Sequence, residues 1–401
     1  DLKEPIPFLD GRRLVSIGYD STSITAGLQK NIATNTVVGL AYDYDEGESA
    51  FKASVKSLSD VYNTSPDGND DGDDVDETLV EKAKHFGCFI ATTICKNSQT
   101  ISRTVARYAL KNVDCDFLKT AFRDVLCTLC MHGFVGVAIG MDGASENRSW
   151  LHSVLTHTVK DLFDLGYCPV TWTIDPFLPS DIKIAFLHPC FDKKEHVFVV
   201  ASPDMPHLVK KVVNAMEKSS LDHEKRNLKK DSQMINLKMV ESVWRDMQTE
   251  GKLTMTRLTK DHFEKNPNSR MRSFLAFQVL SSRTSKLIQA WLKENIDPSK
   301  EEQYKPLGEL ILLVDKLVDV MNASNKNHDG VDRPEHLDME HLLKVVRFFD
   351  AWRQENENDK NLGSFDFIPS YLYEDIVWLG LGTSFLAHRY CSESFGNVRL
   401  K

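Results

Sequence analysis

Two aspartates, far apart in the chain, each close a short apolar segment that predicts a β-strand. Asp20 ends LVSIGYD (14–20), and Asp142 ends FVGVAIGMD (134–142). Adjacent strands lie about 4.8 Å apart, so carboxylates at matching strand ends can share a cation. Mg²⁺ and Mn²⁺ prefer oxygen ligands, and two such ions can activate an attacking oxygen and stabilise a leaving oxygen in phosphodiester chemistry. The pair predicts a divalent-metal site.

Simpler interpretations compete with this one. An aspartate at a strand end is commonly a turn or helix-capping residue. Asp43 also ends an apolar segment and is an alternative to Asp20. His207, beside Pro206 at a predicted helix start, is typical of a capping or packing histidine.

The elements that position these acids predict an α/β fold. Three short strands, a helix, a strand, a helix and a further strand follow one another, which is the order of an RNase H-like mixed sheet. Asp114 is the expected N-cap of the first helix, which carries apolar residues at helical spacing. These elements are strands 14–20, 23–29, 36–43 and 87–95, helix 114–131, strand 134–142, a helix from near Ser145, strand 196–204 and a helix after it.

A long helical stretch interrupts the alternation of strands and helices. From about residue 205 to 375 the apolar spacing is almost wholly helical. We therefore expect an RNase H-like catalytic domain with a large all-α insertion. The predicted divisions are 1–204, with an acidic disordered loop near 64–78, the insertion at 205–375, and the start of a returning core helix at 376–401.

Composition sets limits on partners. The 401 residues are 41% hydrophobic and 27% charged, with a net charge of −9. Much of the acid lies in SPDGNDDGDDVDE (65–77), so the remainder is close to neutral and can contact DNA where basic residues share a face. No apolar run is long enough to span a bilayer. The chain begins at Asp1 and ends abruptly at Lys401, which indicates a fragment.

The eight cysteines are typical of an intracellular protein with reduced thiols. Cys127 and Cys130 form a CxxC within the apolar stretch VLCTLCMHG. A zinc site needs a second ligand pair at regular spacing, and the sequence shows none. Core cysteines of a helix are the favoured interpretation.

Five segments, in order, resemble motifs of the P-element-like DNA transposases, a family that includes the vertebrate THAP-domain proteins. GMDGASENRSW (140–150) is similar to the motif of the second catalytic aspartate, and residues 16–43 are similar to the opening three strands, which carry the first. The other three segments are VVASPDMPHLVKKVVNAM (199–216), SRMRSFLAFQVLSSRTSKLI (269–288) and LILLVDKLVDVMNAS (310–324).

The resemblance implies an RNase H-like domain that cuts and joins DNA with Mg²⁺ or Mn²⁺, in a nuclear protein that forms homo-oligomers. It also implies GTP binding by the helical insertion, where the acid and amide of an Asp-x-x-Asn motif fall on Asp319 and Asn322. Lys210 is a candidate contact to nucleotide or DNA phosphates. Because the chain has no GxxxxGK[ST] loop, a conventional phosphate-binding loop is excluded as the GTP site.

The family's third acid is a glutamate before Phe-Gly-x-x-Arg. Aligned on Phe395, Gly396 and Arg399, that position holds Ser392, and Glu393 follows one residue later. One residue turns a helical side chain by about 100°. We expect Glu393 to complete the metal site with Asp20 and Asp142.

The predicted function is therefore metal-dependent strand cleavage and strand transfer at transposon ends. The displaced glutamate and the acidic balance favour a rival: a domesticated, catalytically inactive protein that keeps the fold as a DNA-associated or interaction scaffold. A nuclease of the same fold is a second rival, and it would cut DNA without joining strands.

Overall fold

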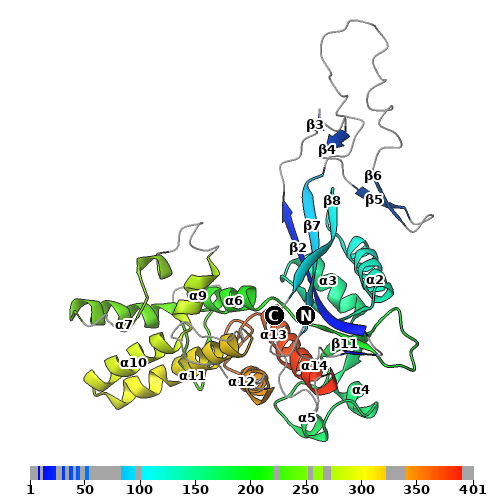
Figure 1. Cartoon of the computed structure of the whole chain (residues 1–401). Coiled ribbons are helices and arrows are strands. Elements are labelled where there is room, and N and C mark those ends of the chain that lie inside the picture. The colour runs from blue at the N-terminus through cyan, green and yellow to red at the C-terminus, as the bar shows by residue number, and fades with distance from the viewer. Residues whose placement is uncertain are drawn as a thin grey trace, which may run out of the picture.

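The computed structural model describes most of the chain. It covers residues 12–23, 83–94, 101–219, 226–251, 256–264, 272–321 and 339–390, together with the backbone of short strands at 8–9, 29–31, 36–38, 42–45 and 50–53. Two lobes are visible in Figure 1, one built on a twisted sheet and the other made of helices.

The sheet is mixed, as the sequence predicts. Strands β2, β9 and β12 are parallel to one another, and the remaining neighbours pair antiparallel. Short strand β1 (Phe8–Leu9) pairs with β2. The strand order across the sheet is β10 (His157–Thr158), β11 (Lys183–Leu187), β12 (Phe198–Ala201), β9 (Phe134–Met141), β2 (Arg12–Ser23), β7 (His85–Thr93) and β8 (Ser102–Leu110).

The three antiparallel strands are not the ones predicted. Strand β2 pairs with β7, and β7 pairs with β8. The predicted second strand (23–29) overlaps β3 (Gln29–Asn31) only at Gln29, and the predicted third strand (36–43) begins with β4 (Thr36–Val38). These two short strands pair with each other in a separate two-stranded sheet. Long-range pairing decides this arrangement, because β2 and β7 share a nine-residue register that local propensity does not reveal.

Asp43 is excluded as a neighbour of Asp142 in the central sheet. It lies in β5 (Tyr42–Asp45), which pairs with β6 (Ala50–Ala53) in another two-stranded sheet. Asp20, by contrast, lies within β2 in the main sheet. It does not end that strand as predicted, because β2 continues in register with β7 as far as Ser23.

Helix α2 (Cys115–Met131) confirms the predicted core helix. The Asp114 carboxylate accepts a hydrogen bond from the Phe117 backbone N–H at 2.8 Å, which caps the helix. The Phe122 ring stacks on Trp150 of α3 (Ser145–Val154) at 4.1 Å between centroids, so the helices before and after β9 pack together. The predicted apolar face is buried at Phe117, Leu118, Ala121, Phe122, Val125 and Leu129.

The helical lobe follows β12 directly. In α11 the buried residues Leu307, Leu310, Ile311, Val314 and Leu317 recur at helical spacing, so apolar burial holds the lobe together. Its helices are α6 (Met205–Lys218), α7 (Leu237–Thr249), α9 (Ser273–Val279), α10 (Ser282–Glu294), α11 (Pro298–Met321) and α12 (Met339–Asn358). Short elements of the chain are α4 (Val159–Asp164), α5 (Val170–Ile174), β13 (Lys229–Lys230), β14 (Gln233–Met234) and η2 (Lys260–His262).

The chain then returns to the sheet through α13 (Ser370–Val377), the π-helical segment η3 (Trp378–Gly382) and α14 (Thr383–Tyr390). A Cβ at Gly382 would lie 2.6 Å from the Ala201 carbonyl oxygen, so glycine permits this close approach to β12. The Trp378 indole donates to the Lys183 carbonyl at 3.0 Å. Among the described residues, no helix combines the length and apolar character that a membrane span requires.

Candidate functional site

Asp20 and Asp142 lie side by side towards the carboxyl ends of the central parallel strands β2 and β9. This end of the sheet is called the carboxyl edge below. Strands β2 and β9 run parallel, and their register pairs Tyr19 with Met141. One residue further along each strand comes the aspartate, and matching positions of parallel neighbours face the same side of a sheet. Burial raises the pKa of the Tyr19 hydroxyl, and the negative charges of Asp142 and Asp20 raise it further. Both carboxylates therefore lie within electrostatic range of the same Tyr19 hydroxyl.

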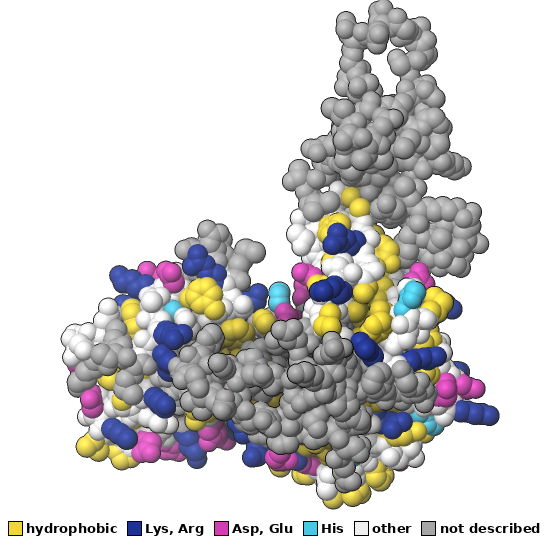
Figure 2. Space-filling model, in the orientation of Figure 1, with side chains coloured by type: hydrophobic (Ala, Val, Ile, Leu, Met, Phe, Trp, Pro, Cys, Tyr) yellow, Lys and Arg dark blue, Asp and Glu magenta, His cyan; other side chains and the backbone are white. Residues whose placement is uncertain are grey.

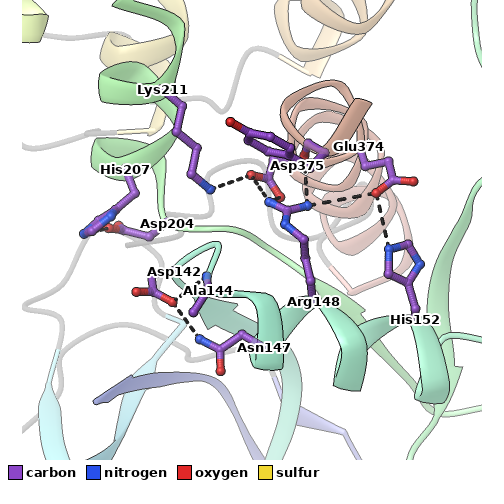
Figure 3. A network of polar contacts seen from close by, with 11 residues as sticks. Asp142, Ala144, Asn147, Arg148, His152, Asp204, His207, Lys211, Glu374 and Asp375 are labelled. Atoms are coloured by element: carbon purple, nitrogen blue, oxygen red, sulfur yellow. Dashed lines mark hydrogen bonds and ion pairs between the residues drawn. The ribbon is translucent and has the colours of Figure 1, made fainter. Parts of the chain in front are cut away.

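The Asp142 carboxylate is held in place by the start of α3. Its Oδ1 accepts hydrogen bonds from the Asn147 side-chain amide at 2.6 Å and from the Ala144 backbone N–H at 3.1 Å (Figure 3). Asn147 is buried, so this contact also fixes the helix against the strand end. One oxygen of Asp142 is thus used for orientation within the protein.

A third carboxylate reaches the same edge. Strand β12 runs parallel to β9, and the Asp204 backbone N–H donates to the Met141 carbonyl at 3.0 Å. Burial raises the pKa of Asp204, and the charge of Asp142 adds to this shift. The His207 ring lies 3.7 Å from the Asp204 carboxylate, and both side chains are partly exposed. The sequence motif around His207 is therefore beside Asp142.

An ionic junction, formed by Arg148, Lys211 and Asp375, lies next to the Asp142 turn. Arg148 donates to both oxygens of Asp375 at 2.8 and 2.7 Å, and Lys211 donates to one of them at 3.0 Å (Figure 3). Asp375 is buried, whereas the two cations are partly accessible. A Cβ at Gly143 would overlap the Lys211 ammonium, so the junction packs directly against the turn that follows Asp142. It joins α3, α6 and α13.

Sequence reasoning missed Asp375. The acid stands between Leu372, Tyr373, Ile376 and Val377, on a helix that is largely apolar. A carboxylate on such a face is rare unless it is paired, and this was the available signal. Its two partners come from segments more than 150 residues away, which no local pattern shows.

The remaining predicted site residues differ in their relation to this edge. Lys210 lies on α6, where its positive charge opposes the rise in the pKa of Asp204, and Asp319 is exposed near the end of α11. Asn322 and Glu393 lie outside the described residues. Within the described part of the chain, no group of three or more His, Cys, Asp or Glu side chains is placed to hold a metal ion. The proposed three-acid metal site therefore stays a prediction.

Comparisons with known proteins agree with the sequence resemblance. Residues 206–334 match the model of the TNP-like GTP-binding insertion domain. The structure is similar to that of the Drosophila P element transposase in its strand transfer complex, with 15% sequence identity and a TM-score of 0.58 over 97% of this chain and 68% of that chain. No curated protein sequence matches. At this identity the structural likeness shows a shared fold, an α/β architecture with an RNase H-like sheet. The insertion-domain match and the shared fold together agree with the resemblance of the chain to P-element-like transposases.

Proposed function

We propose that the chain is the catalytic core of a DNA transposase that cuts transposon ends and joins them to target DNA. The observation that carries the proposal is the register of β2 and β9, which sets Asp20 beside Asp142. Two carboxylates at matching positions of neighbouring parallel strands offer hard oxygen ligands, so this donor set fits Mg²⁺ or Mn²⁺.

Asp20 and Asp142 would hold the cation, with Glu393 as the expected third ligand. When bound, the cation lowers the cost of generating a nucleophilic oxygen and stabilises charge on the leaving oxygen. Asn147 and the Ala144 N–H orient Asp142 for this role. Arg148 and Lys211 bring positive charge beside the same turn, and Asp375 fixes their positions.

The open side of the sheet supplies a surface for DNA. Strand β8 is the sheet edge, and Arg103, Val105 and Arg107 are exposed on it. Figure 2 shows basic side chains among hydrophobic ones on this projecting part. The register aligns Arg107 with Cys88, and Cys88 with Asp20. These three residues therefore form one row across strands β8, β7 and β2 that ends at the proposed metal ligand. Arginines in such a row can contact phosphates of a strand that reaches Asp20.

GTP binding is proposed for the insertion, with Asp319 and Asn322 as contacts to the nucleotide and Lys210 as a phosphate contact. The family match at residues 206–334 supports this part. Asp315 lies one turn before Asp319, and burial raises its pKa, with the charge of Asp319 as a further cause. We also propose nuclear localisation and a homo-oligomer that holds two DNA ends.

A cleavage and joining assay tests the proposed function. The full chain is incubated with Mn²⁺ and a duplex carrying the terminal sequences of its own element. We expect cut ends and joined products, and a loss of at least about 100-fold in rate for Asp142→Asn. Asparagine keeps the Oδ1 acceptor, so folding should be preserved. Asp164→Asn, an exposed acid on α4, is the matched control and should cut like the wild type.

The same assay separates the rival functions. Cutting without joining would identify a nuclease. DNA binding without cutting would identify the inactive scaffold, which the serine at position 392 favours. Neither cutting nor DNA binding would contradict every DNA-directed assignment.

A further inference from the structure

Three cysteine thiols converge at the end of the sheet opposite the carboxylates. Cys127 and Cys130 lie on the last turns of α2, and Cys190 lies between β11 and β12. The Cys190 thiol is 2.7 Å from the Cys127 sulfur. Ordinary non-bonded contacts between heavy atoms are about 3.5–4.0 Å, and a disulfide bond is about 2.05 Å. Small adjustments of two side chains would therefore bring these sulfurs into bonding distance.

We propose that Cys127 and Cys190 form a reversible disulfide, a thiol modification site of this protein. Cys130 also interacts with Cys190, but its sulfur accepts from the Arg12 guanidinium at 3.4 Å. The remaining thiols contact other groups. Cys88 contacts the Thr104 hydroxyl and Cys115 contacts the Ser153 hydroxyl, each at 3.8 Å.

Accessibility favours the same pair. Cys127 and Cys190 are partly exposed, whereas Cys130 and Cys168 are buried. A small oxidant can therefore reach both members of the pair. A metal site is the competing use of a thiol cluster, but these thiols are not placed as a metal-binding group among the described residues.

The oxidant is a small-molecule disulfide such as oxidised glutathione. The Cys127 thiolate attacks it, which releases one glutathione thiolate and leaves a mixed disulfide on Cys127. Cys190 then displaces the second glutathione thiolate, and the Cys127–Cys190 bond forms. The two thiol protons pass to the released thiolates, so one oxidised glutathione becomes two reduced ones. Burial and the neighbouring thiols raise the pKa of Cys190, and the same balance holds whichever of the two thiolates attacks first.

The bond would tie α2 to the β11–β12 connection, across 63 residues of sequence. Helix α2 leads into β9, which ends at Asp142, and the connection leads into β12, which precedes Asp204. The cross-link would therefore connect the start of β9, which leads to Asp142, with the start of β12, which leads to Asp204. It would stabilise the sheet lobe by restricting the unfolded chain.

The test is peptide mapping of the full-length protein. The reduced chain is incubated with oxidised glutathione, free thiols are blocked, and peptides are separated without reductant and identified by mass. We expect a Cys127–Cys190 linkage at about ten times the yield of any linkage involving Cys88 or Cys115. Dithiothreitol should remove it.

Variants give a second readout. Cys130→Ser should keep the linkage and Cys190→Ser should lose it. Oxidation should raise the melting temperature of wild type and Cys130→Ser by several degrees, but not that of Cys190→Ser. If oxidised wild type carries only separate glutathione adducts, or only a Cys130–Cys190 linkage, the assignment is overturned. Since wild type alone decides the mapping, a variant that fails to fold does not obscure the result.

Discussion

The carboxyl edge of the sheet and the helical lobe are stabilised by different forces. At the edge, Asp142 is held by its near neighbours Asn147 and Ala144, whereas Asp375 is held by Arg148 and Lys211 from segments more than 150 residues away. In the helical lobe, residues such as Leu307 and Trp352 are buried within an apolar core. The helical lobe also holds a buried carboxylate, Asp350, but its cation Arg353 lies only three residues away on the same helix. The edge instead depends on an ionic junction between residues that are far apart in the chain.

The largest expected effect on stability is the loss of a buried apolar side chain in the helical lobe. Leu307→Ala leaves a cavity in a fully buried position and should lower the free energy of unfolding by about 3–4 kcal/mol. Urea denaturation measures the loss, which should hardly change with salt. Leu312→Ala, on an exposed face of the same helix, should cost less than about 1 kcal/mol. Equal losses for both variants would contradict the described packing of α11.

His188 provides a pH test at the far end of the sheet. Burial lowers the pKa of His188 to about 4, and the positive charge of Arg12 contributes. The unfolded chain takes up this proton near pH 6.5 and the folded chain near pH 4. Stability is therefore full above pH 6.5 and falls by about 3 kcal/mol as pH drops to 4.

The measurement is the free energy of unfolding at pH 7 and pH 4, for wild type and His188→Gln. The variant should lack about 3 kcal/mol of the wild-type pH dependence. His132→Gln, an exposed histidine, should behave like wild type. An unchanged pH dependence in His188→Gln would refute the assignment of this shift to His188.

Neutralising Asp375 tests the ionic junction. Asp375→Asn leaves Arg148 and Lys211 without their shared counter-charge and should cost about 2 kcal/mol, less than a fully buried pair because both cations are partly solvated. Glu357→Gln removes an exposed partner of Arg353 and should cost less than about 1 kcal/mol. Thermal and urea unfolding at low and high salt compare the two. If Asp375→Asn is as stable as wild type, the junction does not hold α3, α6 and α13 together.

The smallest expected effect concerns nucleotide binding by the lobe. Asp319→Ala should weaken GTP binding about tenfold, or about 1.4 kcal/mol. Titration calorimetry of the full chain measures this, with the exposed Asp297→Ala as the matched control. Equal GTP affinity in wild type and Asp319→Ala would remove Asp319 from the site.

Local signals in the sequence predicted the parts of the fold that local physics determines. Asp114 as a cap, the apolar face of α2 and the strand ending at Asp142 all follow from spacing within one element. The pairing of β2 with β7 and β8 did not follow. Strand β8 is mostly exposed and mixes Arg103, Arg107 and hydroxyl residues with apolar ones, so it lacks the apolar run that marks a core strand.

The candidate site was predictable in part for the same reason. Asp20 and Asp142 each follow an apolar stretch of sequence, so their type and place were visible, although β2 continues three residues beyond Asp20. The contacts of Asp204 with β9 and of Asp375 with Arg148 depend on how distant elements pack. The meeting of Cys190 with Cys127 also depends on tertiary structure, because HPC (188–190) and CTLC (127–130) are separate in sequence.

Mn²⁺ binding tests most directly whether Asp20 and Asp142 form one metal site. Titration calorimetry of the full chain compares wild type, Asp20→Asn, Asp142→Asn, the double variant and the control Asp164→Asn. We predict that each single change weakens Mn²⁺ binding at least about tenfold, and that the double variant is little worse than either. Wild-type affinity in Asp20→Asn, or strictly additive losses in the double variant, would show that the two carboxylates do not share a cation.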